Sequence, residues 1–145
     1  MKFWDSSALV PLLVHKAATP FFSAVYARDP LMTVWWGTKV ECVSALARYE
    51  RDPRAAIGLN IADGFRRLED AASHWHEIAA SESVRETALI LLRRHVLRAA
   101  DALQLGAATV ARQERGAALE FVCADRNLSQ AAVNDGFNVL SPETA

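Results

Sequence analysis

The chain opens with Lys2-Phe3-Trp4-Asp5-Ser6-Ser7-Ala8-Leu9, a segment that predicts a strand followed directly by a helix. Residues 2–4 are expected to form a short first strand, which Asp5 ends. Ser6 or Ser7 is a suitable N-cap for a helix that runs to about residue 15. An acidic side chain is therefore expected at the carboxyl end of the first strand.

Strands and helices alternate along the rest of the chain. Short strands are expected at residues 31–36, 75–79, 119–124 and 137–140. Helices are expected at residues 20–28, 38–51, 53–73, 83–95, 99–115 and 127–135. Short apolar strands joined by helical crossovers favour a parallel sheet that is covered on both faces. We therefore expect a single α/β domain over residues 1–145, with three α/β/α layers and a short, mainly parallel central sheet.

The composition excludes several classes of protein. The 145 residues are 52% hydrophobic, which is typical of a globular chain and not of a disordered one. The 16 Lys and Arg residues nearly balance the 17 Asp and Glu residues, which argues against binding to DNA or membranes through bulk charge. Two cysteines cannot form a disulfide framework or a Cys-rich zinc site. Without a secretory signal or an apolar run of about 18 residues, the protein is expected to be cytoplasmic and not bound to a membrane.

Four acidic residues stand at unusual positions. Asp5 and Asp125 directly follow predicted strands, and open parallel sheets bind ligands beyond the carboxyl ends of their strands. Glu41 lies one helical turn after the second predicted strand, beside small residues that leave room around it. Asp101 lies on the apolar face of its predicted helix, where an unpaired carboxylate is costly. All four are therefore candidates for a functional site.

Each of these acids also has a purely structural interpretation. Asp5 and Asp125 are suited to cap the helices that follow them, and Glu41 is suited to complete a capping box with Thr38. Four acids that converge on one sheet edge are harder to explain as separate caps, because clustered carboxylates repel one another. A hard divalent cation relieves this repulsion, and oxygen ligands favour Mg²⁺ or Mn²⁺ over Zn²⁺. Such a site is suited to phosphoryl chemistry.

Four motifs, taken in order, resemble those of the PIN-domain ribonucleases, and most closely the VapC-type toxins of bacterial toxin–antitoxin modules. They are FWDSSAL at 3–9, VECVSAL at 40–46, RAADALQLGAA at 98–108, and FVCADRNL at 121–128 with a following Gly136-Phe137. The resemblance covers nearly the whole chain and implies a PIN-like fold.

The resemblance also implies the site residues. The acidic quartet of the family, which binds metal and carries catalysis, corresponds to Asp5, Glu41, Asp101 and Asp125. A supporting hydroxyl falls at Ser7, and a water-mediated metal contact falls at Asn127.

Arg98 and Arg126, each close to an acid of the quartet, are candidate RNA contacts, although Arg98 also fits a solvated helix end.

The implied activity is that of an endoribonuclease that hydrolyses RNA phosphodiester bonds with Mg²⁺ or Mn²⁺. The implied partners are an RNA substrate, a cognate VapB-like antitoxin whose C-terminal segment fills the groove, and a second copy of the chain in a homodimer. Two alternatives stay open: a PIN-domain nuclease outside toxin–antitoxin systems, acting in RNA processing or on DNA, and a non-catalytic PIN-like module that binds RNA or protein. A haloacid-dehalogenase-type phosphatase is excluded, because it needs a second Asp where Ser7 stands.

Overall fold

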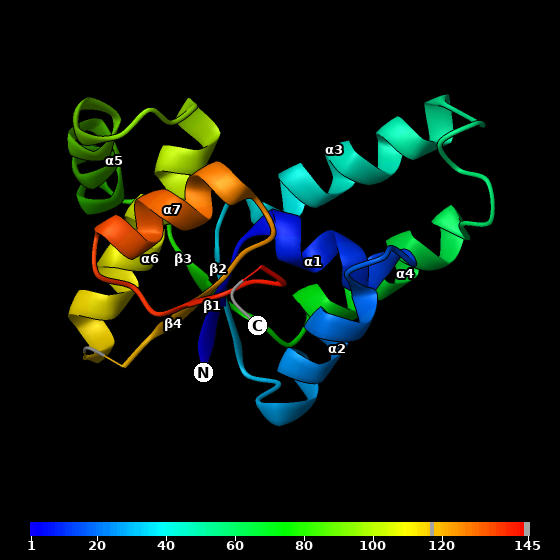
Figure 1. The fold of residues 1–145 in the computed structure, drawn as a ribbon, viewed down its shortest axis with the longest axis horizontal. Helices are drawn as coiled ribbons and strands as arrows, with labels where there is room; N and C mark the ends of the chain where they lie inside the picture. The colour runs from blue at the N-terminus through cyan, green and yellow to red at the C-terminus, as the bar shows by residue number, and fades with distance from the viewer. Residues whose placement is uncertain (117, 144–145) are drawn as a thin grey trace.

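The structure, a computed structural model, describes residues 1–116 and 118–143 (Figure 1). Within these residues, the chain forms five strands and seven helices, with one or two helices between successive strands. The strands are β1 (Lys2–Trp4), β2 (Met32–Trp35), β3 (His76–Ile78), β4 (Glu120–Val122) and β5 (Val139–Leu140). The helices are α1 (Ser6–Leu13), α2 (Thr19–Arg28), α3 (Thr38–Arg51), α4 (Ile61–Ala72), α5 (Glu82–Arg94), α6 (Ala99–Arg115) and α7 (Arg126–Asn134).

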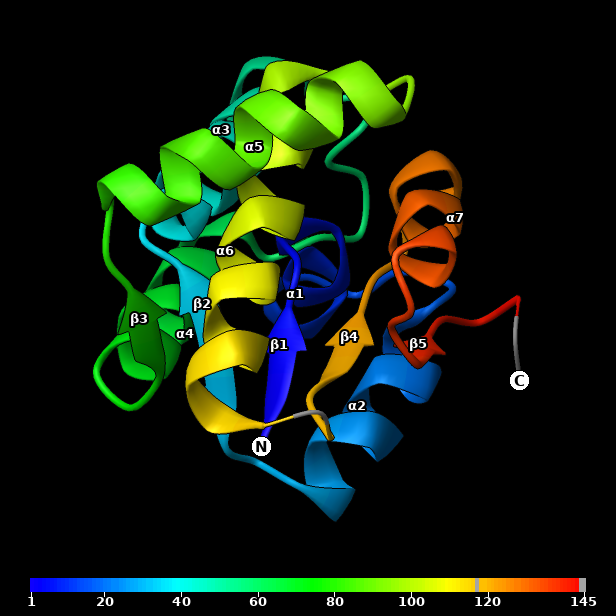
Figure 2. The ribbon, with the colours of Figure 1, turned by 90° about the vertical axis from the view of Figure 1, so that its left-hand side faces the viewer.

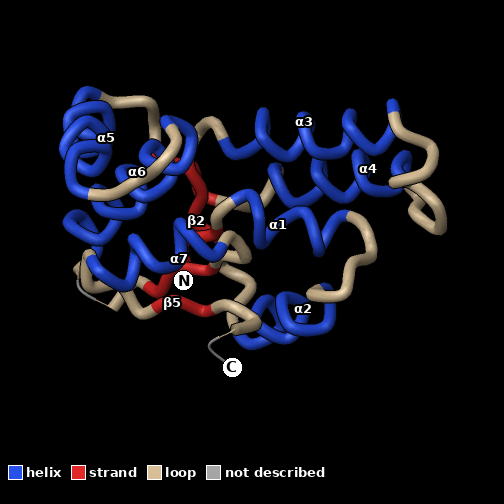
Figure 3. Tube along the Cα trace, turned by 45° about the horizontal axis from the view of Figure 1, so that its top comes forward, coloured by secondary structure: helices blue, strands red, loops and turns tan. Residues whose placement is uncertain are grey.

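The strands form one parallel sheet in the order β3-β2-β1-β4-β5. Strand β1 lies at its centre, where Phe3 is in register with Thr33 of β2 and with Phe121 of β4. Helices α5, α6 and α7 cover one face of the sheet, and α1 to α4 cover the other (Figures 1 and 3). The predicted α/β class and three-layer architecture are therefore confirmed, with a sheet in which every described pairing is parallel.

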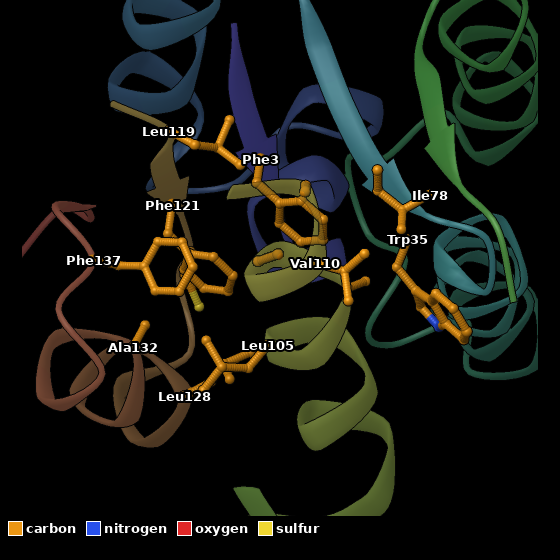
Figure 4. Close-up of a cluster of buried hydrophobic side chains, with 14 of the residues drawn as sticks. Phe3, Trp35, Ile78, Leu105, Val110, Leu119, Phe121, Leu128, Ala132 and Phe137 are labelled. Carbon is orange, nitrogen blue, oxygen red and sulfur yellow. The ribbon is translucent and has the colours of Figure 1, made fainter. Parts of the chain in front are cut away.

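Successive residues of a strand point into two different cores, one on each side of the sheet. Phe3 belongs to the core beneath α5, α6 and α7, where its ring stacks on Phe121 with centroids 5.6 Å apart (Figure 4). The next residue, Trp4, belongs to the core beneath α1 to α4. Because both faces of the sheet are buried, the strands are apolar on both sides, as is typical of parallel sheets.

The strand order creates a topological switch point between β1 and β4. From β1 the chain builds β2 and β3 on one side, and it later adds β4 and β5 on the other side. In Figure 2 the arrows of β1 and β4 point to the same edge of the sheet, where Asp5 and Asp125 begin the following helices. Open parallel sheets bind ligands at such a point.

One helix differs clearly from the prediction. The helix expected from residue 53 begins only at Ile61, with Asn60 as its N-cap. The residues before it form turns, and Gly58 has a φ of +76°, in the left-handed region that interrupts a helix. Among the described helices, none combines the length and the apolar character that a membrane crossing requires.

Candidate active site

A cavity of about 510 Å³ opens at the carboxyl edge of the sheet. Four carboxylates line this cavity, and each comes from a different part of the fold. They are Asp5 after β1, Glu41 in α3, Asp101 in α6 and Asp125 before α7. The fold thus gathers in one cavity the four acids that stand at unusual positions in the sequence.

Asp5 is the N-cap of α1, so the prediction that a serine caps this helix is wrong. Its Oδ2 atom accepts hydrogen bonds from the Ser7 backbone N–H at 3.0 Å, from the Ser7 hydroxyl, and from the Cys123 thiol at 3.7 Å. Asp5 is only 3% exposed. The Ser7 hydroxyl oxygen also accepts hydrogen bonds from the backbone N–H groups of Ala124 at 2.9 Å and Asp125 at 3.2 Å. Ser7 therefore joins the end of β1 to the loop after β4.

Asp125 and Asp101 are held by local contacts. Asp125 is the N-cap of α7, and its Oδ1 atom accepts a hydrogen bond from the Leu128 backbone N–H at 2.8 Å. Asp101 lies in the first turn of α6, and its side chain is 15% exposed. The Arg98 guanidinium donates to Asp101 Oδ2 at 3.3 Å, but the Arg98 side chain is largely exposed. Such an exposed ion pair orients the carboxylate only weakly.

Glu41 lies one turn into α3 and does not form the predicted capping box. Gly37, not Thr38, is the N-cap of α3, and no side chain of the described residues caps this helix. The Oε2 atom of Glu41 instead accepts hydrogen bonds from the Ser6 hydroxyl at 2.5 Å and from the Gln104 amide nitrogen at 3.1 Å. The capping-box interpretation is therefore wrong, and side chains of α1 and α6 hold this carboxylate.

The four carboxylates share one feature: a single oxygen of each receives all of its hydrogen bonds. The engaged atoms are Asp5 Oδ2, Glu41 Oε2, Asp101 Oδ2 and Asp125 Oδ1. The other oxygen of each accepts no hydrogen bond from the residues that the structure describes. A carboxylate held by one oxygen can ligate a cation through the other while its orientation stays fixed.

The oxygen donors of this site are of the type that a hard divalent cation prefers, but the described carboxylates are not arranged as the ligands of a bound cation are. No group of three or more His, Cys, Asp or Glu side chains in residues 1–116 and 118–143 is arranged so that it could hold a metal ion as it stands. Carboxylates without a counter-ion repel one another, and a cation would draw them together. The fit therefore rests on the type and orientation of the oxygen donors.

The electrostatics of Asp5 support this interpretation. Burial raises the pKa of Asp5 from its usual value to about 6, and the carboxylates of Glu41 and Asp101 act in the same direction. The hydrogen bonds from Ser7 oppose the rise. The contribution of Glu41 and Asp101 shows that negative charge is concentrated around Asp5, and carboxyl groups with a perturbed pKa gather at functional sites.

Neither of the two cysteines is among the described residues that line the acidic cavity. Burial raises the pKa of the Cys42 and Cys123 thiols to about 12, so both stay protonated near neutral pH. Only a thiolate is a strong metal ligand. Cys123 contributes to the site as a weak hydrogen-bond donor to Asp5, and the ligands on offer are oxygen atoms.

Two of the predicted site residues face elsewhere. Asn127 and Arg126 are not among the described residues that line the cavity. The Asn127 amide donates to the Val96 carbonyl at 2.7 Å, and Arg126 forms an ion pair with Glu143 at 2.8 Å. Arg98, by contrast, lines the cavity. A metal contact by Asn127 and an RNA contact by Arg126 stay predictions, and each would require these side chains to leave their present partners.

Three residues that line the cavity or support its carboxylates are not among the predicted site residues. Ser6 and Gln104 hold Glu41, and Arg48 adds a basic side chain to the cavity wall. Gln104 is a polar residue within an apolar helix face, one turn after Asp101, and this contrast was the available signal. Ser6 and Arg48 stand among polar neighbours, where no such contrast exists.

A larger hollow of about 720 Å³ adjoins the acidic cavity, because Val40 lines both. Trp36 and Trp75 are among its lining residues. Among its described lining residues, Glu77 is the only acid, and its carboxylate accepts a hydrogen bond from Trp75 Nε1 at 3.1 Å. The smaller, acidic cavity is therefore the better candidate for catalysis.

No protein-family model and no curated protein matches the sequence. Solved structures, however, are similar in fold. A toxin–antitoxin complex from Klebsiella pneumoniae matches with a TM-score of 0.62 at 16% identity, over 89% of this chain and 91% of that one. PAE2754 from Pyrobaculum aerophilum matches with a TM-score of 0.67 at 20% identity, over 99% and 90%. VapC20 of Mycobacterium tuberculosis, a sarcin–ricin loop-cleaving toxin, matches with a TM-score of 0.62 at 19% identity, over 94% and 96%.

These matches extend over nearly the full length of both chains in each comparison. The common feature is therefore the whole architecture and not a single βαβ unit. At these identities the likeness shows the fold alone. The chain has the PIN-like α/β fold that its motifs predict.

Proposed function

We propose that this protein is an endoribonuclease that hydrolyses RNA phosphodiester bonds and depends on Mg²⁺ or Mn²⁺. One observation supports the proposal above all: four carboxylates from separate elements line one cavity, each with one oxygen free of hydrogen bonds from the described residues. The residues that would hold the cation are Asp5, Glu41, Asp101 and Asp125. When bound, such a cation polarises a phosphate group and lowers the pKa of a water molecule.

The side chains of the cavity have distinct tasks in this proposal. Ser7 fixes the Oδ2 atom of Asp5 and leaves its Oδ1 atom free for the cation. Arg48 and Arg98 line the cavity and would contact RNA phosphates. Asp5 has to lose its proton before it can ligate a cation, so we expect cleavage to weaken as the pH falls below about 6.

The decisive test compares wild-type protein with the variant Asp101→Asn in an RNA cleavage assay with Mg²⁺ or Mn²⁺. We expect wild-type protein to cleave RNA and to stop when EDTA removes the metal. Asp101→Asn should lose cleavage by about three orders of magnitude, because a metal site supplies several kcal/mol of transition-state stabilisation. Its thermal unfolding should stay close to that of wild type.

The matched control is Asp70→Asn, which makes the same change on the exposed face of α4 and should leave cleavage unchanged. Equal cleavage by wild type and Asp101→Asn would contradict the proposal. If the activity resisted both the substitution and EDTA, it would come from a contaminating nuclease.

We further propose that the protein is the toxin of a toxin–antitoxin pair, bound and inhibited by a VapB-like antitoxin, and that it forms a homodimer. The support is the likeness in fold to a toxin–antitoxin complex and to a toxin. Expression of the chain alone should arrest growth, and co-expression of its cognate antitoxin should restore it. Normal growth during expression of active enzyme would argue for a nuclease outside such modules. Sedimentation of the purified protein tests the homodimer.

A further inference from the structure

Gln104 is a fully buried amide at the edge of the candidate site. It lies in α6, one turn after Asp101, and it is 0% exposed. Burying an amide group without hydrogen bonds costs free energy, so a buried glutamine is expected to form hydrogen bonds with its neighbours. The contacts of Gln104 therefore indicate what it does.

Both N–H groups of the Gln104 amide are directed at polar atoms of α3. The Nε2 atom donates to Glu41 Oε2 at 3.1 Å and to Thr38 Oγ1 at 3.1 Å. Thr38 is itself fully buried and lies one turn before Glu41, so it shares a helix face with that residue. Gln104 thus connects two residues of α3 to α6 in a buried hydrogen-bonded chain.

The amide carbonyl oxygen of Gln104, unlike its N–H groups, makes no hydrogen bond to the described residues. This Oε1 atom is buried. The amide therefore satisfies its donors and leaves its acceptor unpaired. This arrangement defines the orientation of the amide, because a reversed amide would place its carbonyl oxygen against a carboxylate oxygen.

We infer that Gln104 is a positioning residue for Glu41: with Ser6, it holds Oε2 and turns Oε1 toward the shared cavity, where Oε1 can ligate a divalent cation. The inference rests on the proposed function, since it concerns the metal-binding role of Glu41. Both donors act on the same oxygen of Glu41, and the other oxygen stays free. Outer groups that orient metal ligands in this way typically contribute about 10- to 100-fold to metal affinity or activity.

The test is a titration of metal-free protein with Mn²⁺, followed by electron paramagnetic resonance of the free ion. Gln104→Met keeps the length of the side chain and removes both donors, so the dissociation constant for Mn²⁺ should rise by about 10- to 100-fold. Gln130→Met makes the same change on the exposed face of α7 and should bind Mn²⁺ like wild type. The unfolding temperature of the metal-free variant should fall, because the substitution removes the unpaired carbonyl oxygen of Gln104 but leaves the buried Thr38 hydroxyl without its donor.

A second variant covers the case in which Gln104→Met fails to fold. Gln104→Glu preserves the shape of the side chain but sets a second carboxyl group against Glu41. When that carboxyl is protonated, it can donate to Glu41 in place of the amide. The deficit in Mn²⁺ affinity relative to wild type should therefore shrink as the pH is lowered, which a merely structural role of Gln104 does not predict.

The outcomes separate the inference from the function on which it rests. If wild-type protein binds no Mn²⁺, the proposed function fails whatever Gln104 does. If wild type binds Mn²⁺ and folded Gln104→Met binds it within about twofold, the positioning role is wrong and the proposed function stands. A pH-independent deficit in Gln104→Glu would likewise overturn the positioning role.

Discussion

The two halves of the acidic cavity are held in different ways. Asp5 and Asp125, the strand-end pair, each cap a helix and accept a hydrogen bond from a backbone N–H two or three residues further on. Glu41 and Asp101, the helix pair, lie inside the first turns of α3 and α6, where their carboxylates accept hydrogen bonds only from side chains of the described residues. Backbone N–H groups therefore help to orient the strand-end pair, whereas Glu41 is oriented by side chains alone and Asp101 only by its weak pair with Arg98.

This difference determines how each half can be disturbed. A capping interaction forms with the strand-to-helix junction itself, so the orientation of the strand-end pair is part of the local fold. Glu41, by contrast, depends on Ser6 from α1 and Gln104 from α6, so its orientation exists only when the three helices are packed together. A substitution of Ser6 or Gln104 can therefore change the orientation of Glu41 without changing the backbone. A substitution of Asp5 or Asp125, by contrast, is expected to affect both the site and the stability of the fold.

The largest expected effect of this coupling is at Asp5. Asp5→Asn should lower RNA cleavage by about three orders of magnitude, because a metal ligand is lost. In EDTA at pH 8 the same substitution should stabilise the protein, since it removes a buried carboxylate whose pKa is raised to about 6. The shift from 3.8 corresponds to an upper limit of about 3 kcal/mol in the free energy of unfolding. Denaturant unfolding of the two proteins measures the difference.

The pH dependence provides the control for Asp5. The folded protein binds the Asp5 proton more tightly than the unfolded chain does, so this carboxyl contributes stability below about pH 4 and loses it as the pH rises through 6. Metal-free wild type should therefore lose stability over this range relative to Asp5→Asn. Parallel stability curves for the two proteins between pH 4 and 8 would show that burial of Asp5 does not have the expected cost.

Two substitutions of Asp125 separate its proposed role in metal binding from its role as a helix cap, and their expected effects are smaller. Asp125→Asn keeps an acceptor for the Leu128 N–H and removes the charge, so it should weaken Mn²⁺ binding and leave stability unchanged. Asp125→Ala removes both, and should lower the free energy of unfolding by about 1 kcal/mol in addition. Chemical denaturation and Mn²⁺ titration of both variants measure the two effects. If the Ala variant is as stable as the Asn variant, Asp125 does not support α7 as its hydrogen bond indicates.

The sequence predicts the strand-end pair better than the helix pair, for a physical reason. Asp5 and Asp125 follow apolar strands directly, and a parallel sheet brings the carboxyl ends of its strands to one edge. Glu41 and Asp101 can be placed near that edge from helix periodicity. Their partners cannot, because Ser6 and Gln104 lie 35 and 63 residues from Glu41 in the chain. Contacts of this kind depend on how helices pack, which periodicity does not specify.

The fold shows the same limit. The α/β class follows from the alternation of strands and helices, and most element positions agree within a few residues. The sequence does not predict the late start of α4 at Ile61, because the segment before it contains the good helix formers Arg54, Ala55 and Ala56 after Pro53. The turn there depends on the left-handed backbone of Gly58, a conformation that glycine permits but that the sequence does not require.

The smallest expected effect concerns the basic wall of the cavity. Arg98 lines the cavity and pairs weakly with Asp101, so Arg98→Ala should leave stability nearly unchanged. If Arg98 contacts an RNA phosphate, the variant should bind RNA more weakly, and the slope of log affinity against log salt should fall by about 1. Arg126→Ala is the matched comparison, since Arg126 faces Glu143 and should alter the slope less. Binding is measured in an Asp5→Asn background, which prevents cleavage and keeps the Arg98–Asp101 pair intact. A larger change in slope for Arg126→Ala than for Arg98→Ala would mean that RNA approaches the cavity from the α7 side and draws Arg126 away from Glu143.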